Sequence, residues 1–254
     1  MSEAEVDWRP FCSPIRDQGG CGSCTAFGTI SAWEANIKIK QSKEVDLSEA
    51  DLFFCSGGTC ELGNTMDPVL NRAIRGVATE ECCPYVDKTR LCGMGRCSEW
   101  WKTGVKLEVW HSITDIEQMK DALFLSPLVG VMAVHESFLH YVDGIYHNLG
   151  EQDQIVGYHC ISIVGYSESK KAWLLRNSWG TGWGMKGYCW IQYGDSEIDE
   201  IMYSLNLSDE EPKPDEPICS YARFVSKIPL VGWSMIKLYR KIRKLIFGIE
   251  AGIP

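Results

Sequence analysis

The chain has 254 residues, a length that fits one large domain or two lobes with a short appendage. Hydrophobic residues make up 45% of the sequence, so a sizeable core can form. The net charge of −9 at pH 7 argues against nucleic acid as a partner of the main body. This charge is unevenly distributed, because residues 218–254 carry +6 and the rest of the chain carries −15.

Helices are predicted in the first half of the chain. Apolar residues at helical spacing indicate three of them, at Thr25 to about Lys40, Ser48 to about Cys55, and Met66–Arg75. Either Asp46 or Ser48 would cap the second helix. The stretch from Thr79 to Gly104 is rich in Cys, Gly and Pro and has no periodicity, so we expect a loop region held by cross-links.

Strands are predicted in the second half. The candidates are Val105–Ser112, Leu128–Val134, His159–Tyr166, Ala172–Arg176 and Gly187–Tyr193. One helix, capped by Thr114 and ending near Leu125, is expected among them. Helices early and strands late predict an α+β fold with two lobes. The helical lobe would cover about residues 20–104, and the sheet lobe about residues 105–207 with the N-terminal segment.

A glycine-rich loop leads into the first helix and places Cys24 at its first turn. Unpaired backbone N–H groups and the helix dipole favour an anion there. A thiolate is such an anion, and it is the form of cysteine that attacks electrophiles or binds metals. Gln18 can present an amide N–H to the same place as an oxyanion donor. From this stretch alone, a buried structural cysteine is an equal alternative.

A nucleophilic cysteine needs a base, and the base needs an orienting group. His159 opens one apolar run and Asn177 follows the next, eighteen residues later. Two such runs are typical of an antiparallel strand pair, which would bring His159 and Asn177 side by side. The other four histidines have no asparagine or aspartate set off in this way, and we interpret them as ordinary surface or core residues.

In the order Gln18, Cys24, His159 and Asn177, with Trp179 and Trp183 beyond, these residues resemble the papain-type cysteine peptidases. The resemblance covers roughly residues 6–207. It implies a papain-like fold with a helical lobe, an antiparallel β lobe and an active site in the cleft between them. It also implies a cysteine endopeptidase that hydrolyses polypeptide substrates through a Cys24–His159 pair and a thioester acyl-enzyme, without a metal or other cofactor. Gln18 would stabilise the oxyanion, and Asn177 would orient His159.

The resemblance also suggests substrate-binding residues, although each has ordinary packing as its alternative. Val131, Gly157 and Cys160 lie where the wall of the S2 pocket would be, and Trp183 where the leaving side would pack. Trp179 would shield the bond between histidine and asparagine. The complete expected set is Gly22, Ser23, Gly63, Val131, Gly157, Tyr158, Trp179 and Trp183. A papain-fold protein that binds without cleaving, or that catalyses another acyl transfer, is the alternative function.

Twelve cysteines indicate an oxidising compartment, although residues 1–7 lack the pattern of a secretory signal. The pairs Cys55/Cys60 and Cys92/Cys97 leave open a structural zinc site. The family resemblance implies disulfides instead, joining Cys21 to Cys60 and Cys55 to either Cys92 or Cys97. The adjacent Cys82 and Cys83 would pair elsewhere, with Cys12 as one candidate. We expect Cys160 and Cys189 to be buried thiols.

The end of the chain has a different character. Ser208–Pro217 is acidic and rich in proline, which predicts a linker without a core. Residues 218–254 combine apolar residues at helical spacing with lysines and arginines. Such a basic amphipathic segment suits an anionic membrane surface or a protein partner. Its alternative is a helix folded back onto the acidic main body. We expect a monomer.

Overall fold

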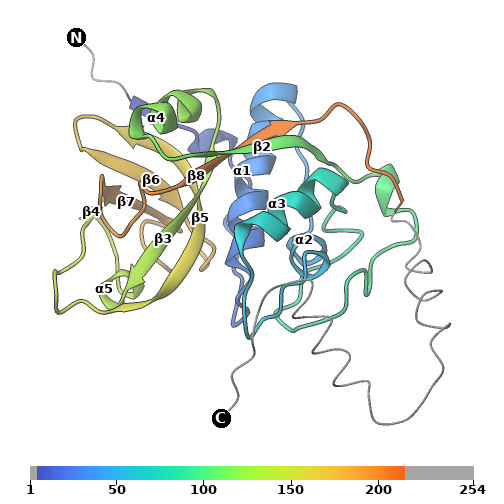
Figure 1. Ribbon diagram of the computed structural model, residues 1–254, viewed down its shortest axis with the longest axis horizontal. Coiled ribbons are helices and arrows are strands. Elements are labelled where there is room, and N and C mark those ends of the chain that lie inside the picture. Colours follow the sequence, from blue (N-terminus) through green and yellow to red (C-terminus); the bar gives the residue numbers. More distant parts are fainter. Residues whose placement is uncertain (1–4, 215–254) are drawn as a thin grey trace, which may run out of the picture. The chain divides into compact units, whose positions relative to one another are not determined.

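The computed structural model describes residues 5–214 (Figure 1). Its helices are α1 (Cys24–Gln41), α2 (Glu49–Cys55), α3 (Met66–Arg75), α4 (Ile116–Leu125) and α5 (Glu136–Leu139), with 3-10 turns at Arg9–Phe11 and Trp100–Lys102. Its strands are β1 (Glu5–Asp7), β2 (Leu107–Ile113), β3 (Leu128–His135), β4 (Ile145–Tyr146), β5 (Ile155–Ser167), β6 (Ala172–Arg176), β7 (Tyr188–Gln192) and β8 (Met202–Leu207). The predicted helices and strands are all present, whereas α5, β1, β4 and β8 are not predicted from the sequence.

The strands form one sheet in the order β2-β8-β3-β5-β6-β7-β4, and β1 pairs with β5. The neighbours are antiparallel except for β4 and β7. Strands β5 and β6, which are consecutive in the sequence, pair so that Ser162 lies opposite Arg176. The runs that carry His159 and Asn177 are therefore neighbours, as expected.

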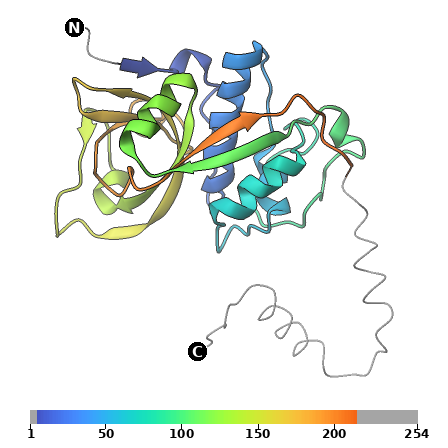
Figure 2. The same cartoon turned by 45° about the horizontal axis from the view of Figure 1, so that its top comes forward.

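Two hydrophobic cores give the fold its two lobes. In Figure 1 the helices α1, α2 and α3 lie to one side, and β3 to β7 lie to the other. The helical core contains Trp33 and Phe53, and the sheet core contains Trp173 and Phe138, all of them fully buried. Figure 2 shows β2 and β8 reaching from the sheet along α3, and Leu107 and other residues of these strands complete the helical core. This arrangement confirms the predicted α+β class with two lobes.

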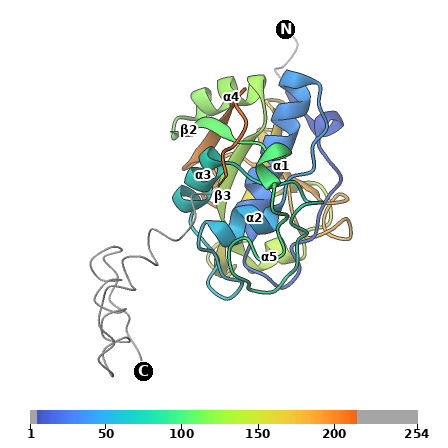
Figure 3. The ribbon, with the colours of Figure 1, turned by 90° about the vertical axis from the view of Figure 1, so that its right-hand side faces the viewer.

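Helix α1 lies at the seam between the lobes; Figure 3 views it from the side of α2 and α3. Gly28 packs directly on β5, and a Cβ atom at this position would lie 2.8 Å from Cys160 Sγ and 3.1 Å from the backbone of Ile161. Arg176, at the end of β6, donates hydrogen bonds to Ser31 Oγ of α1 and to the carbonyl of Pro14 at 2.8 Å. The seam thus joins the helix that begins at Cys24 to the two strands that carry His159 and precede Asn177.

Two helix caps decide where helices begin. Ser48 Oγ accepts the Asp51 N–H at 2.9 Å, which selects Ser48 rather than Asp46 as the cap of α2. The prediction of Thr114 as the cap of α4 is wrong. Asp115 Oδ1 accepts the Gln118 N–H at 2.9 Å, because Asp115 directly precedes the helix and its carboxylate reaches the third helical residue.

The predicted linker is partly ordered against the helical lobe. Pro212 is buried, and a Cβ atom at Gly104 would lie 3.2 Å from its ring. Lys106 and Glu210 form an ion pair at 2.6 Å. Residues 210 and 212 therefore contact the helical lobe, and the linker role of Ser208–Pro217 remains a prediction. The other predicted domain boundaries remain predictions, and residues 218–254 lie outside the described residues.

Three disulfides hold the helical lobe, and they join Cys21 to Cys60, Cys55 to Cys92 and Cys82 to Cys97. The first is the expected bond, and the second settles the choice for Cys55. The zinc alternative is wrong, because the four sulfurs it requires are all in disulfides. Cys12 is a free thiol, so its suggested pairing with Cys82 or Cys83 is also wrong; Cys83 is free and Cys82 bonds Cys97.

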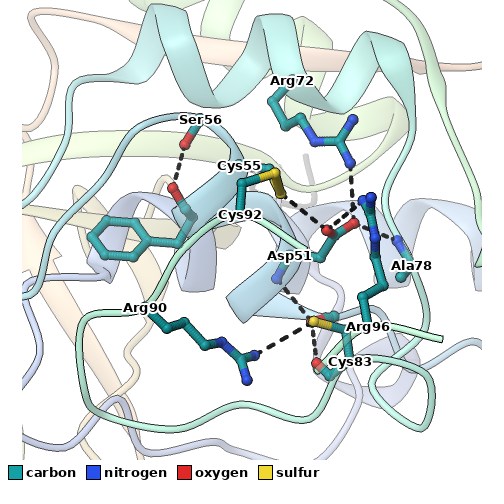
Figure 4. The surroundings of a disulfide bond; sticks show 11 residues. Asp51, Cys55, Ser56, Arg72, Ala78, Cys83, Arg90, Cys92 and Arg96 are labelled. Atoms are coloured by element: carbon teal, nitrogen blue, oxygen red, sulfur yellow. Dashed lines mark hydrogen bonds and ion pairs between the residues drawn. A yellow bond between two sulfur atoms is a disulfide. The ribbon is translucent and has the colours of Figure 1, made fainter. Parts of the chain in front are cut away.

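A buried carboxylate supports the region of the second disulfide (Figure 4). Asp51 accepts from the guanidinium groups of Arg72 at 3.2 Å and Arg96 at 2.9 Å, and from the Ala78 N–H at 2.9 Å. Both arginines also lie near the ring of Trp100. The negative charge is thus paired and hydrogen-bonded, as burial requires. Among residues 5–214, we find no helix of the length and apolarity needed to cross a membrane.

Candidate active site

Cys24 is the first residue of α1 and has a free thiol that is half-buried. The loop before it is fastened by the Cys21–Cys60 disulfide and by the Gly22 N–H, which donates to the Cys60 carbonyl at 2.9 Å. A side chain at Gly22 would lie 3.0 Å from that carbonyl and 3.1 Å from Gly63 Cα, so the close approach needs glycine. The loop therefore sets the thiol at the helix N-terminus, as predicted.

His159 and Asn177 form the expected pair. Asn177 Oδ1 lies 2.8 Å from His159 Nε2 and also accepts the Ser178 N–H at 2.8 Å. Because the second bond requires an oxygen at that position, His159 must donate through Nε2. Nδ1 of the neutral ring is then the acceptor, which is the state a general base needs.

Aromatic rings enclose the histidine. The ring of Trp179 lies 4.7 Å from the His159 ring at an angle of 33°. Trp183 meets Trp179 edge-on at 5.3 Å, and its indole N–H donates to the Phe138 carbonyl. His159 is only 5% exposed as a result. Trp179 thus packs against the ring that bonds Asn177, and its expected role in shielding that bond from water stays a prediction.

Gln18 is buried beside the loop. Its Nε2 donates to the Cys21 carbonyl at 2.9 Å, and its Oε1 accepts from Ser178 Oγ at 2.7 Å. Its backbone N–H donates to the Ser178 carbonyl at 2.9 Å. These bonds orient the amide, and within residues 5–214 they leave the second N–H on Nε2 without a hydrogen bond of its own; the role of Gln18 as an oxyanion donor stays a prediction.

One open cavity of about 520 Å³ contains both Cys24 and His159. Of the expected substrate-binding residues, Val131 and Tyr158 line this cavity, and so does Cys160. Gly157 is exposed on β5 next to Tyr158, while Gly22 and Gly63 pack together below the loop. Trp179 and Trp183 do not line the cavity; Trp179 packs on His159, and Trp183 packs on Trp179.

Ser23 does not belong with the substrate-facing side chains. It is completely buried, and its hydroxyl lies 2.7 Å from Tyr85 OH, which donates to the Gln18 carbonyl at 2.8 Å. Its side chain therefore supports the loop and cannot contact a substrate. The tyrosine that ties Ser23 to Gln18 has no signal in the sequence.

Sequence reasoning also missed half of the cavity wall. The additional lining residues are Thr25, Asn64, Thr65, Met66, Asp67, Ile201 and Tyr203. The residues from 64 to 67 enter α3, and the wall on the other side belongs to β8 and the residue before it. Of the expected substrate-binding residues, Gly63 is the one that directly precedes this part of the wall in the chain.

Burial governs the electrostatics of the pair. It raises the pKa of the Cys24 thiol, although backbone N–H groups of Cys160 and Thr25 act in the opposite direction. It lowers the pKa of His159 to about 4, against a smaller upward effect of the bond to Asn177. Burial thus opposes the thiolate that the N-terminus of the helix favours. For both side chains, burial opposes the charged form.

Comparison with known proteins decides the family. The family model described as "Papain family cysteine protease" matches residues 2–205. The chain belongs to the papain family. It is 32% identical to cathepsin K of Gallus gallus over 198 residues, which are 73% of this chain and 57% of the relative. It is 33% identical to cysteine endopeptidase RepA of Oryza sativa subsp. japonica over 220 residues, which are 82% of this chain and 56% of the relative.

Solved structures of papain-family proteins have the same fold. The proform of the ragweed pollen allergen Amb a 11 superposes with a TM-score of 0.69 at 28% identity, covering 83% of this chain and 68% of that chain. The Carica candamarcensis protease CMS1MS2 in complex with E-64 gives a TM-score of 0.67 at 25% identity, covering 80% and 98%. The chain spans about half the length of the curated relatives it matches.

Proposed function

We propose that this chain is a cysteine endopeptidase that hydrolyses polypeptides through Cys24. One observation carries the proposal: Cys24 and His159 line the same open cavity, and the far side of His159 is held by Asn177. Family membership supports the same chemistry, since the relatives include a protein named as a cysteine endopeptidase. A protein that only bound peptides would have no need of this set of residues.

In the proposed reaction, Cys24 Sγ attacks the peptide carbonyl while its proton passes to His159 Nδ1. The backbone N–H of Cys24 and the free N–H of Gln18 Nε2 stabilise the oxyanion, and one such donor contributes about 3–4 kcal/mol. His159 then protonates the leaving amine as the thioester forms. Water, activated by the same ring, hydrolyses the thioester and regenerates the thiol.

The two pKa shifts are compatible with this order of reaction steps. Burial opposes a thiolate or an imidazolium that stands alone, which is what the two pKa shifts express. Proton transfer creates both charges together, and their attraction offsets part of the cost of desolvation. The two groups should therefore ionise as a pair rather than independently.

Covalent labelling tests the proposal directly. The epoxide inhibitor E-64 should add one equivalent to the wild-type protein, and Cys24→Ala should abolish both labelling and peptide cleavage. Cys12→Ala removes a free thiol outside the cavity and serves as the matched control. Cleavage that survives in Cys24→Ala, or a folded wild-type protein that neither cleaves peptides nor reacts with E-64, would show the proposal to be wrong.

For the remainder of the chain we propose a monomer whose residues 218–254 bind an anionic membrane surface. Membrane binding is supported by the basic amphipathic pattern alone, since residues 218–254 lie outside the described part of the chain. To test membrane binding, the full chain and a form without residues 218–254 are each co-sedimented with vesicles rich in phosphatidylserine. Equal binding by both forms would remove the membrane role.

A further inference from the structure

Asp67 introduces a negative charge into the cavity that contains Cys24. The lining includes the apolar side chains of Met66, Val131, Ile201 and Tyr203, together with the uncharged polar residues Asn64 and Thr65. Met66 and Tyr203 are buried in the helical core, and Asp67 follows Met66 in the first turn of α3 with its side chain exposed. The cavity therefore combines several apolar side chains with the carboxylate of Asp67. The thiol of Cys24 lies in the same cavity.

The charge of Asp67 has no counterion within residues 5–214. None of the salt bridges there includes Asp67, and no lysine or arginine is among the residues that line the cavity. Its field reaches the cavity wall, because the pKa of Tyr203 is raised first by burial and then by the charge of Asp67. A cation that entered the cavity would meet this carboxylate.

We propose that Asp67 makes the enzyme prefer substrates with a lysine or arginine side chain in this part of the cavity, close to the scissile bond. This inference rests on the proposed peptidase function. Lysine and arginine have long apolar stems that can lie on Met66 and Ile201 while the charged end stays near water. Such a side chain satisfies both the apolar wall and the carboxylate. A leucine satisfies only the wall, and a glutamate is repelled.

The size of the effect follows from exposure. Asp67 is on the surface, so an ion pair with it resembles an exposed pair, which usually contributes no more than about 1 kcal/mol. We therefore expect about a fivefold preference, since 1.4 kcal/mol corresponds to tenfold. Added salt should reduce the preference, because mobile ions screen charges in contact with solvent.

The test uses fluorogenic peptides that differ at one position. Lysine, leucine or glutamate is placed one, two or three residues before the scissile bond, and kcat/KM is measured with enzyme titrated by E-64. At one of these positions, the wild type should favour lysine over glutamate, and Asp67→Asn should lower the lysine-to-leucine ratio about fivefold. Asp121→Asn removes the same charge from α4 and should leave the ratio unchanged.

The outcomes separate the two proposals. A wild type that cleaves the leucine peptides and reacts with E-64, but has the same lysine-to-leucine ratio as Asp67→Asn at all three positions, would overturn the role of Asp67 alone. A wild type that cleaves none of the peptides and does not react with E-64 would instead overturn the peptidase function. Asp67→Lys should shift the preference toward glutamate, and a lysine preference that persisted in this variant would also overturn the inference.

Discussion

Asn177 and His159 are joined by a hydrogen bond of 2.8 Å between Oδ1 and Nε2, and the Ser178 N–H holds the same oxygen in place. This arrangement leaves His159 one orientation in which Nδ1 can accept a proton. The Trp179 ring packs on the His159 ring, and His159 is almost completely buried.

We predict that Asn177→Ala lowers kcat by about a hundredfold, because general base catalysis of this size depends on a ring held in position. KM should change much less, since Asn177 does not line the cavity with Cys24. Steady-state kinetics with one peptide would measure both. The matched control is Asn71→Ala, at a surface asparagine that accepts from Trp110. Equal rates for Asn177→Ala and wild type would show that Asn177 does not position the base.

Gln18→Ala should lower kcat by roughly a hundredfold or more, because it removes one donor to the oxyanion. The change also breaks the bonds to the Cys21 carbonyl and Ser178 Oγ, so we expect a loss of about 1–3 kcal/mol in the free energy of unfolding. Rates should therefore be measured below the unfolding transition, with E-64 titration of active enzyme. A variant with reduced stability but normal turnover would restrict Gln18 to a structural role.

Gly28→Ala should destabilise the seam between the lobes. The new methyl group would lie 2.8 Å from Cys160 Sγ and 3.1 Å from the Ile161 backbone, an overpacking that typically costs about 1–3 kcal/mol. Adding Cys160→Ala should restore part of this loss, because it removes the sulfur but leaves the backbone contact. Denaturant unfolding of the four proteins gives the coupling energy. Gly182→Ala, where a Cβ would meet nothing within 4 Å, is the control.

Stability should fall as the pH rises from about 5 to 8. Burial raises the pKa of Glu34 to about 7, and burial together with the charge of Glu34 raises that of Glu49 to about 8. Both carboxyls bind protons more tightly in the folded chain than in the unfolded chain, where the ordinary pKa of 4.5 applies. Their contribution is therefore complete below that value and is lost as the pH passes 7 and 8.

Urea unfolding at pH 5.5, 7.0 and 8.5 would measure this slope. Glu49→Gln should flatten it, because glutamine is uncharged at every pH. Glu80→Gln changes a less buried carboxyl of the same lobe and serves as the comparison. A stability that rises across this range in the wild type would contradict the prediction.

The sequence was sufficient for features that depend on local patterns. The helix that begins at Cys24 follows a glycine-rich loop, and His159 and Asn177 lie on strands that are consecutive in the chain, so their pairing needed no long-range information. Strand β8 shows the opposite case. It inserts between β2 and β3, and nothing in its own residues indicates that Tyr203 reaches the cavity.

Burial was the second obstacle. The direction of the Cys24 pKa shift depends on how much protein surrounds the sulfur, which no motif reports. Asp67 was overlooked for a similar reason, because it is an ordinary helix-start residue until the fold brings it to the same cavity as Tyr203 of β8. The predicted cap Thr114 and the observed cap Asp115 are neighbours in the chain, and only the geometry of the turn distinguishes them.

The contacts of Gly28 and Arg176 at the seam limit how far the two lobes can move apart. It fastens the nucleophile-bearing helix to the strands that support the base, so the two lobes cannot hinge apart there without breaking the hydrogen bonds to Ser31 and Pro14. If the cavity cannot widen in this way, a substrate must adapt its own conformation in order to bind. With the proposed peptidase function, native globular proteins should therefore resist cleavage except at long surface loops, while denatured chains should be cleaved readily.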